Sequence, residues 1–198
     1  LINETITGMK DGFSSIRFEQ VKGRGPAKIW AEMMSHHHYL GYSWSVGRSV
    51  KYLFYAGADL IGGMSWGSAC WKLRARDELI GWDAATREKN LQGVAGNHRF
   101  LILPHVRVKN LASFLLSRSV KQVAVNWQQR YGVELHLLES FVDPSRFQGT
   151  CYKAANWIYL GQSQGASKKG NAYVWHGQVK DVYVYPLRAD YRERLCER

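Results

Sequence analysis

The amino-acid sequence predicts an α/β domain with a mixed, mostly antiparallel sheet, in which a central parallel pair of strands is flanked by helices. The main observation is a strand pattern at 100–104, an amphipathic helix pattern at 110–131 and an alternating strand pattern at 133–142, all within ~40 residues. This order implies a right-handed crossover and a parallel strand pair. Hairpin patterns at 50–66 and 173–185 add antiparallel strands.

The amino-terminal part of the chain is expected to hold one helix and one hairpin. Residues 1–25 are polar and rich in glycine, which predicts an irregular extension. Pro26 suits the first position of a helix, and apolar side chains then recur at helical spacing over 27–34. Two β-rich runs, 50–56 and 60–66, flank a short glycine-containing connection and predict the hairpin.

The remaining segments predict further helices and strands. Residues 74–96 are charged and only loosely periodic, so we expect a helical segment without clear bounds. A short helix at 152–156 and a strand at 157–161 should follow the central crossover. The basic segment 162–171 predicts a flexible loop, and the last hairpin should pair 173–175 with the strand that ends at residue 185.

Length and composition predict one folded domain over residues 1–198. Hydrophobic residues make up 45% of the chain and aromatic residues 13%, which is enough for one core. No internal repeat or long linker divides the sequence. No apolar run approaches the ~20 residues of a membrane span, and no leader peptide opens the chain. We therefore expect a soluble cytoplasmic protein without a membrane partner.

The cysteines and histidines predict no metal site. The three cysteines are far apart and form no C-x-x-C pair, which argues against a zinc site and against a disulfide framework. His36, His37 and His38 are adjacent, and three adjacent imidazoles cannot all face one ion.

The charge of the chain favours a polyanionic partner. Lys and Arg number 27 against 16 Asp and Glu, which gives a formal net charge of +11. Nucleic acid, anionic lipid and a phosphate-rich cofactor all fit such an excess, and so does a merely solubilising surface. Basic residues interleaved with aromatic ones are typical of nucleic-acid binding, so DNA or RNA is the expected partner. The candidate residues for this contact are Arg74, Arg76, Lys168, Lys169, Arg188 and Arg192.

The junction before the long helix is a candidate phosphate site. A helix that starts after a buried parallel strand presents unpaired N–H groups and the positive end of its dipole. Arg107 and Lys109 add positive charge there. An ordinary exposed loop with two basic residues explains the same sequence equally well.

This junction also resembles the pyrophosphate-binding turn of the GNAT acyltransferases, which reads [Q/R]-x-x-G-x-[G/A]. The chain has Arg107, Asn110 and Ala112 at the matching positions. The resemblance implies a GNAT-like fold and acetyl-CoA or another acyl-CoA as cofactor, with Leu111 and Ser113 completing the pyrophosphate site. Asn110 replaces the glycine, and its side chain either leaves the turn open or caps its own helix and blocks the phosphate.

Two further residues take roles from the same resemblance. Tyr152 begins a Tyr-x-x-x-Asn-Trp run where many GNAT members have Tyr-x-x-x-Gly-Phe, and in the family this tyrosine often protonates the leaving thiolate. GNAT enzymes commonly use a strand carboxylate to deprotonate the acceptor amine, and Glu139 is the candidate here. A solvated surface carboxylate explains Glu139 equally well.

Most of the chain resembles the DruA-like family more closely. The strings that carry this resemblance lie, in order, at residues 38–41, 76–82, 97–104, 110–113, 138–143, 149–157 and 182–187. Members of the family are associated with the Druantia anti-phage system and with bacterial mobile elements. The resemblance implies protein partners in a defence or transposition system, and it supplies no biochemical activity.

Two functions are therefore open from the sequence. The first is a nucleic-acid-associated GNAT-like domain of a phage-defence or mobile-element protein. The alternative is an acyl-CoA-dependent N-acyltransferase whose acceptor is an amine, including an amine carried on nucleic acid. Only the second would make the chain an enzyme.

Overall fold

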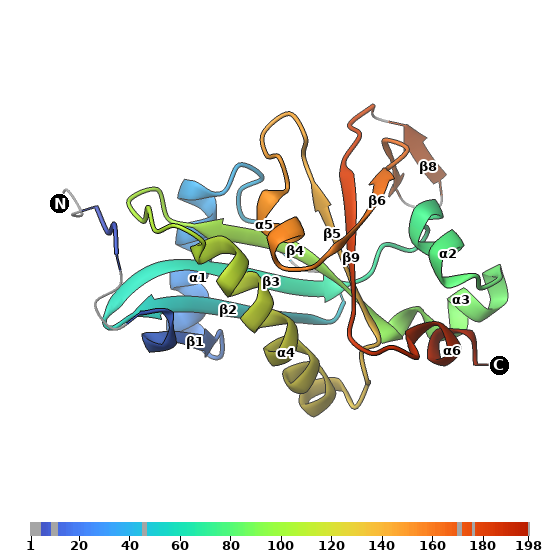
Figure 1. Ribbon diagram of the computed structural model, residues 1–198, viewed down its shortest axis with the longest axis horizontal. Helices are drawn as coiled ribbons and strands as arrows, with labels where there is room; N and C mark the ends of the chain where they lie inside the picture. Colours follow the sequence, from blue (N-terminus) through green and yellow to red (C-terminus); the bar gives the residue numbers. More distant parts are fainter. Residues whose placement is uncertain (1–4, 9–11, 45–46, 170–171, 176, 198) are drawn as a thin grey trace. The chain divides into compact units, whose positions relative to one another are not determined.

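The computed structural model describes residues 5–8, 12–44, 47–169, 172–175 and 177–197, of which 166–169 and 172–173 are described by their backbone (Figure 1). The elements, in chain order, are η1 Phe13–Ser15, β1 Ile16–Gln20, α1 Arg24–His37, β2 Ser49–Ala56, β3 Asp59–Ser68, α2 Arg74–Ile80, α3 Ala84–Asn90, η2 Leu91–Gly93, β4 Val94–Ile102, α4 Leu111–Tyr131, β5 Leu137–Val142, α5 Thr150–Ala154, β6 Ile158–Gln162, β7 Ala166–Lys169, β8 Ala172–Trp175, β9 Asp181–Pro186 and α6 Tyr191–Cys196.

The chain forms two compact units, and each draws on two segments of sequence. The first unit comprises Leu1–Gly67 and Asn97–Asn126, and the second comprises Ser68–Gly96 and Trp127–Arg198. Strand β4 and helix α4 therefore contribute residues to both units. A single domain over the whole chain stays a prediction, because this division does not test whether either unit folds alone.

In the first unit, strands β1, β2, β3 and the later part of β4 are hydrogen-bonded neighbours in that order. Strand β2 pairs antiparallel with both β1 and β3, so the hairpin predicted at 50–66 is confirmed. Helix α1 buries Trp30, Met33 and Met34. The chain packs closely here, because a Cβ atom added at Gly63 would lie 2.7 Å from the Met33 methyl group. Such a close contact leaves room for no side chain larger than that of glycine at position 63.

The prediction that residues 1–25 are irregular is wrong for the part that forms β1 and the start of α1. Ile16 is only 1% exposed, and the Phe18 ring packs against Phe54 with centroids 4.4 Å apart. The alternation of Ile16 and Phe18 was the strand signal. It is short, and the surrounding glycines and charged residues mask it.

In the second unit, the first residues of β4 lie beside β5, followed by β9 and β6. The His136 N–H donates to the Gly93 carbonyl over 2.8 Å just before the two strands. Strand β9 pairs antiparallel with both β5 and β6. The sheet is thus mixed, with one parallel pair, and the predicted fold class is confirmed.

The long helix and the short helix–strand pair after the crossover lie close to their predicted positions, as α4, α5 and β6. The central strands differ more from the sequence pattern. Strand β4 begins at Val94, well before the predicted start at residue 100. Residues 94–96 are buried, but the polar residues that follow them interrupt the apolar pattern in the sequence. Strand β5 begins at Leu137 and not at residue 133 as predicted, and residues 133–136 form no strand.

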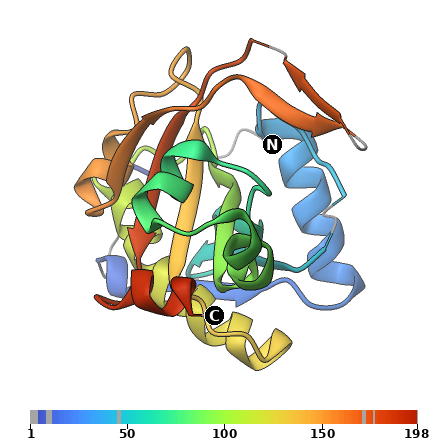
Figure 2. The same cartoon turned by 90° about the vertical axis from the view of Figure 1, so that its right-hand side faces the viewer.

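The segment expected to be helical without clear bounds resolves into α2, α3 and η2. Gly81 has a φ of 85° between α2 and α3, and the Asp83 carboxylate caps α3 by accepting from the Thr86 N–H over 2.7 Å. Figure 2 shows α2, α3 and α6 gathered at one side of β5 and β9. Their contacts form a core of Ile80, Trp82, Leu91, Val94, Leu137, Val184, Tyr191 and Leu195.

The pairing predicted for the last hairpin is wrong. Strand β8 pairs with β7, in the segment expected to be a flexible loop, and β9 instead lies between β5 and β6. The reason is burial, because Val182, Tyr183 and Val184 of β9 are almost fully buried. A strand with such side chains is stabilised in the middle of a sheet. Within the described residues, no helix is both long and apolar enough to cross a bilayer.

Candidate functional site

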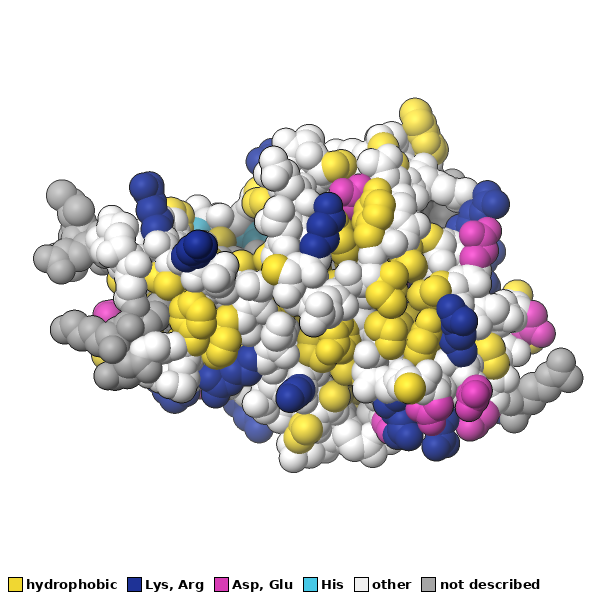
Figure 3. Space-filling model, viewed as in Figure 1, with side chains coloured by type: hydrophobic (Ala, Val, Ile, Leu, Met, Phe, Trp, Pro, Cys, Tyr) yellow, Lys and Arg dark blue, Asp and Glu magenta, His cyan; other side chains and the backbone are white. Residues whose placement is uncertain are grey.

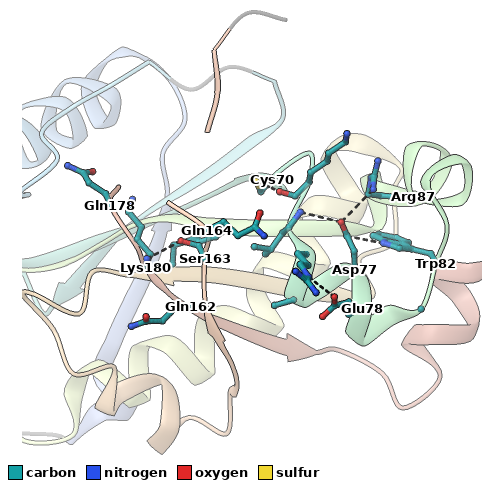
Figure 4. A pocket seen from close by; sticks show the side chains of 16 residues that line it. Cys70, Asp77, Glu78, Trp82, Arg87, Gln162, Ser163, Gln164, Gln178 and Lys180 are labelled. Atoms are coloured by element: carbon teal, nitrogen blue, oxygen red, sulfur yellow. Dashed lines mark hydrogen bonds and ion pairs between the residues drawn. The ribbon is translucent and has the colours of Figure 1, made fainter. Parts of the chain in front are cut away.

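A groove with a volume of about 1120 Å³ lies in the second unit. One wall comes from residues 70–73 and helices α2 and α3, and the other from the segment after β6 and the segment before β9 (Figure 4). The lining residues are Cys70, Lys72, Leu73, Arg74, Ala75, Asp77, Glu78, Gly81, Trp82, Arg87, Phe141, Gln162, Ser163, Gln164, Gln178 and Lys180.

A buried ion pair supports the first wall. Arg76 and Glu139 are both 0% exposed, and Arg76 Nη1 donates to Glu139 Oε2 over 2.7 Å. The other Glu139 oxygen accepts from the Cys70 N–H over 2.6 Å. Arg76 also donates through Nη2 to Asp77 Oδ1 over 2.8 Å, and Trp82 Nε1 donates to the same oxygen over 2.9 Å. Burying charges is favourable only when they are paired in this way, and here the pairing fixes α2 to β5.

The protonation of this network follows from its burial and its charges. Burial acts to lower the pKa of the Arg76 guanidinium, but the Glu139 and Asp77 carboxylates outweigh it and raise that pKa above its usual value. Burial, and then the Glu139 carboxylate, raise the pKa of the Cys70 thiol. A neutral thiol is a poor nucleophile, so Cys70 is not suited to covalent catalysis in this state.

The groove surface is rich in cations and amides. Arg74 is paired with Glu78 over 2.7 Å in an exposed contact. Arg87 is 13% exposed, and its Nη1 lies 3.6 Å from Asp77 Oδ2. The Nε atom of Arg87 is buried and has no hydrogen-bond partner among the described residues. Lys180 and Gln162 lie on the opposite wall, as Figure 4 shows.

Two residues with predicted roles belong to this network and not to an open surface. Arg76 was expected to contact nucleic acid, but its complete burial excludes such a contact in this structure, and that assignment is wrong. Glu139 was expected to deprotonate an amine. Both of its oxygens already accept hydrogen bonds from Cys70 and Arg76, so no acceptor amine reaches it in this arrangement.

Tyr152 lies in an aromatic cluster of the second unit. It is 6% exposed, and the Ser140 hydroxyl donates to its phenolic oxygen over 2.9 Å. Its ring stacks on Tyr183 with centroids 5.2 Å apart and meets the Trp157 ring edge-on at 5.3 Å. The cluster continues to Tyr159, which is 48% exposed, and Figure 3 shows hydrophobic side chains at the surface over β6 and β9.

The candidate pyrophosphate loop lies in the first unit. Asn110 has a φ of 63°, which is the left-handed conformation that glycine adopts most easily. The Asn110 carbonyl accepts from the Phe114 N–H over 3.1 Å and so begins α4. Its side chain makes no hydrogen bond within the described residues, so it does not cap the helix. Because Leu111 is 1% exposed, it anchors the first turn in the core.

The backbone of this loop leaves donors for a ligand. The Leu111 N–H donates to the Val108 carbonyl, whereas the N–H groups of Ala112 and Ser113 have no acceptor among the described residues. The Arg107 side chain is exposed. The Arg107 N–H donates to the Ile6 carbonyl over 2.8 Å, and this contact ties the loop to the segment around Ile6. The loop therefore presents helix-terminal amides beside an exposed arginine.

The other residues predicted to bind nucleic acid lie mostly outside the groove. Arg188 is paired with Glu134 over 2.7 Å and with Asp190 over 2.9 Å. Arg192 is exposed, and its Nε donates to the Tyr191 hydroxyl over 3.1 Å. The side chains of Lys168 and Lys169 lie outside the part of the chain that the structure describes. Among the side chains of these six candidates that the structure describes, Arg74 lines the groove.

Most of the groove residues were not predicted from the sequence. Gln162 and Gln164 alternate at the end of β6, and Gln178 and Lys180 alternate before β9. Alternation by two was the available signal, because it places side chains on one face of an extended segment. The sequence predicts a loop over 162–171, where such alternation carries no strand signal, and it gives no partner segment for Gln178 and Lys180.

Comparison with solved structures relates the fold to acetyltransferases. Aminoglycoside acetyltransferase AAC(6')-Ib in complex with coenzyme A and kanamycin is 14% identical, with a TM-score of 0.56, and the match covers 91% of this chain and 99% of that chain. A spermidine N-acetyltransferase SpeG chimera from Vibrio cholerae is 12% identical, with a TM-score of 0.55 and coverage of 93% and 99%. YncA from Salmonella typhimurium, with acetyl-CoA, is 11% identical, with a TM-score of 0.54 and coverage of 88% and 95%. At such identities the likeness establishes the GNAT-like fold alone.

Comparison at the level of sequence identifies the family. No curated protein matches the chain. A family model described as "Druantia protein DruA" matches residues 3–172, which is most of the sequence. The strings at 38–41, 76–82, 97–104, 110–113, 138–143 and 149–157 all fall inside that match. The chain belongs to the DruA family.

Proposed function

We propose that this chain binds an acyl-CoA at residues 107–113 and transfers the acyl group to an amine. The observation that carries the proposal is the left-handed backbone of Asn110, with a φ of 63°. Glycine, which stands at the matching position of the GNAT turn, adopts this conformation most easily. Asparagine tolerates it better than most residues do, so the change from glycine preserves the shape of the turn.

The donors of the loop suit a pyrophosphate. The N–H groups of Ala112 and Ser113 lie at the first turn of α4, where the dipole of a 21-residue helix favours an anion. The exposed guanidinium of Arg107 adds a charge-assisted donor. Since the Asn110 side chain does not cap the helix, nothing in the described part of the loop occupies these amides. The neighbours solved with coenzyme A or acetyl-CoA support the same cofactor.

A bound acyl-CoA would supply an activated thioester and a thiolate leaving group. The resemblance assigns Tyr152 the role of proton donor for that thiolate, and this role stays a prediction. Its phenolic oxygen accepts from the Ser140 hydroxyl within the second unit. Glu139 does not suit the role of general base while it is paired with Arg76. The proposed enzyme therefore takes its acceptor amine in the neutral form or deprotonates it by another group.

Isothermal titration calorimetry with coenzyme A and acetyl-CoA tests this function. Arg107→Glu should weaken binding by about 100-fold, because it replaces a charge-assisted contact with a repulsion. Arg24→Glu is the matched control, since Arg24 is an exposed arginine of the same unit outside the loop. Binding equal to wild type in Arg107→Glu, or no binding by the wild-type chain at millimolar coenzyme A, would show that the proposal is wrong.

We propose nucleic-acid association as a second function, in keeping with a phage-defence role or a mobile-element role. The formal net charge of +11 supports it, as do Lys72, Arg74, Arg87 and Lys180 in the groove. In this proposal the acceptor amine of the acyltransferase reaction is either free or carried on the nucleic acid, and protein partners of a defence system or transposition system join the complex. Gel-shift titration with single-stranded and duplex DNA and RNA at low salt tests it, and the absence of any complex would refute it.

A further inference from the structure

We infer that the groove of the second unit binds a single strand of nucleic acid, with phosphates on Arg87 and Lys180 and base edges on Gln162, Gln164 and Gln178. This inference rests on the nucleic-acid association proposed above and assigns it to a site. The sequence suggested basic residues for this contact, and the three glutamines were not among them.

The size and charge of the groove fit a segment of a polyanionic polymer. Its volume of about 1120 Å³ lies above the range of roughly 300–1,000 Å³ that holds most small ligands. Lys72, Arg74, Arg87 and Lys180 contribute positive charge to the described lining, against Asp77 and Glu78. The excess of cations favours an anionic ligand along the whole groove.

Arg87 supplies an unsatisfied donor in this lining. Its side chain is 13% exposed, and its Nε atom is buried with no hydrogen-bond partner in the described part of the chain. A buried donor without a partner is unfavourable and rare in folded proteins, so this part of the groove lining is not saturated by protein contacts. Its ion pair with Asp77 is long, at 3.6 Å. The exposed part of the Arg87 guanidinium lines the groove, where a phosphate oxygen can accept a charge-assisted hydrogen bond from it.

The glutamines explain why the ligand is a nucleic acid and not a simple polyanion. An amide side chain both donates and accepts, which matches the donor and acceptor pattern of a base edge. Gln162 and Gln164 lie on one wall with Lys180, opposite Arg87 and Asp77, as Figure 4 shows. Cations and amides therefore line the same groove.

Single-stranded nucleic acid fits this arrangement better than a duplex. In a duplex the bases pair with each other, whereas a single strand presents phosphates and unpaired base edges together. Exposed indole rings close to the groove residues in sequence offer stacking platforms: Trp71 is 38% exposed beside Lys72, and Trp175 is 76% exposed shortly before Gln178. Base stacking on such rings strengthens binding and tolerates any sequence, because every base has a π face.

Fluorescence anisotropy with labelled 12-nucleotide single-stranded DNA tests this inference on the whole chain. The variant Gln162→Ala/Lys180→Gln should bind about tenfold more weakly than wild type, because it loses a phosphate contact and a base contact. Arg130→Gln removes one exposed positive charge of the same unit outside the groove and should stay within about twofold. Gln162 is exposed and Lys180 is partly exposed, so the double variant should fold as the wild type does. Gln164→Ala, at another exposed position, repeats the test without a change of charge.

The choice of probes distinguishes a failure of the groove assignment from a failure of the nucleic-acid association on which it rests. The same strand as RNA should bind within about tenfold of the DNA, and duplex DNA and a 12-residue polyglutamate should bind more weakly than either strand. If wild type binds single strands but the groove variants match it, the groove assignment is wrong and nucleic-acid association stands. If wild type binds no strand at low salt, both are wrong. Preference for duplex or for polyglutamate over single strands also overturns the assignment.

Discussion

Asn110 has a backbone conformation that few side chains tolerate, and this makes it a sharp probe of the loop before α4. Its φ of 63° lies in the left-handed region, where most residues other than glycine cost about 1–2 kcal/mol. Asn110→Gly should therefore preserve or strengthen coenzyme A binding. Asn110→Val should weaken it and lower the urea midpoint, because a β-branched side chain is strained there.

The Asn110 variants also decide between the two interpretations of this residue. If its side chain blocked the phosphate site as a helix cap, Asn110→Gly would convert a chain that does not bind coenzyme A into one that does. Calorimetry on wild type and Asn110→Gly distinguishes these outcomes. Equal, measurable binding by both would agree with an open turn.

His38 predicts a pH dependence in the first unit. Burial, and then the Arg99 charge, lower the His38 pKa from 6.5 to about 4. Its Nδ1 atom accepts from the Leu40 N–H over 3.1 Å, which only a neutral imidazole can do. The unfolded chain binds this proton near pH 6.5 and the folded chain only near pH 4, so the folded state should lose stability as pH falls through that window.

His38→Asn tests this dependence, because asparagine retains an acceptor that does not titrate. Urea unfolding of wild type and variant at pH 7 and pH 4.5 measures the effect. The variant should lose less stability over that interval than wild type. Equal losses would assign the pH dependence to other groups, such as His136, whose pKa is also lowered by burial.

At the scale of elements, the link between α2 and β5 should dominate the stability of the second unit. Arg76→Met leaves Glu139 buried without its partner, which should cost about 3–5 kcal/mol. The double variant Arg76→Met/Glu139→Leu removes both charges and should recover much of that loss. Chemical denaturation of the three proteins checks this. A double variant no more stable than Arg76→Met alone would mean that the ion pair itself, and not the unpaired charge, controls stability.

Elements with a local sequence signal were predicted from the sequence, whereas pairings determined by contacts between distant parts of the chain were not. Helix α4 was predicted because its apolar residues recur at helical spacing over several turns. Strand β9 was assigned the wrong partner, because nothing local in Val182 and Val184 tells whether they face one neighbour or two. The long-range ion pair between Arg76 and Glu139 was equally invisible, so two candidate surface residues proved to be buried partners.

At the scale of the whole molecule, the net charge should control nucleic-acid affinity. Binding to a single strand releases counterions, so affinity should fall by more than tenfold between about 50 and about 200 mM salt. The Gln162→Ala/Lys180→Gln variant should show a salt slope smaller by roughly one contact. Anisotropy titrations at four salt concentrations measure both slopes. Affinity independent of salt would contradict an electrostatic mode of binding.

Amide chemical shifts of the ¹⁵N-labelled chain during titration with coenzyme A test the central claim most directly. The proposed site predicts that the Ala112 and Ser113 N–H resonances move downfield and saturate together, because a pyrophosphate would accept from both amides. The same titration of Arg107→Glu should leave them in place. The account would be contradicted if coenzyme A shifted other resonances of the wild-type chain to saturation but left those of Ala112 and Ser113 in place, or if it shifted none.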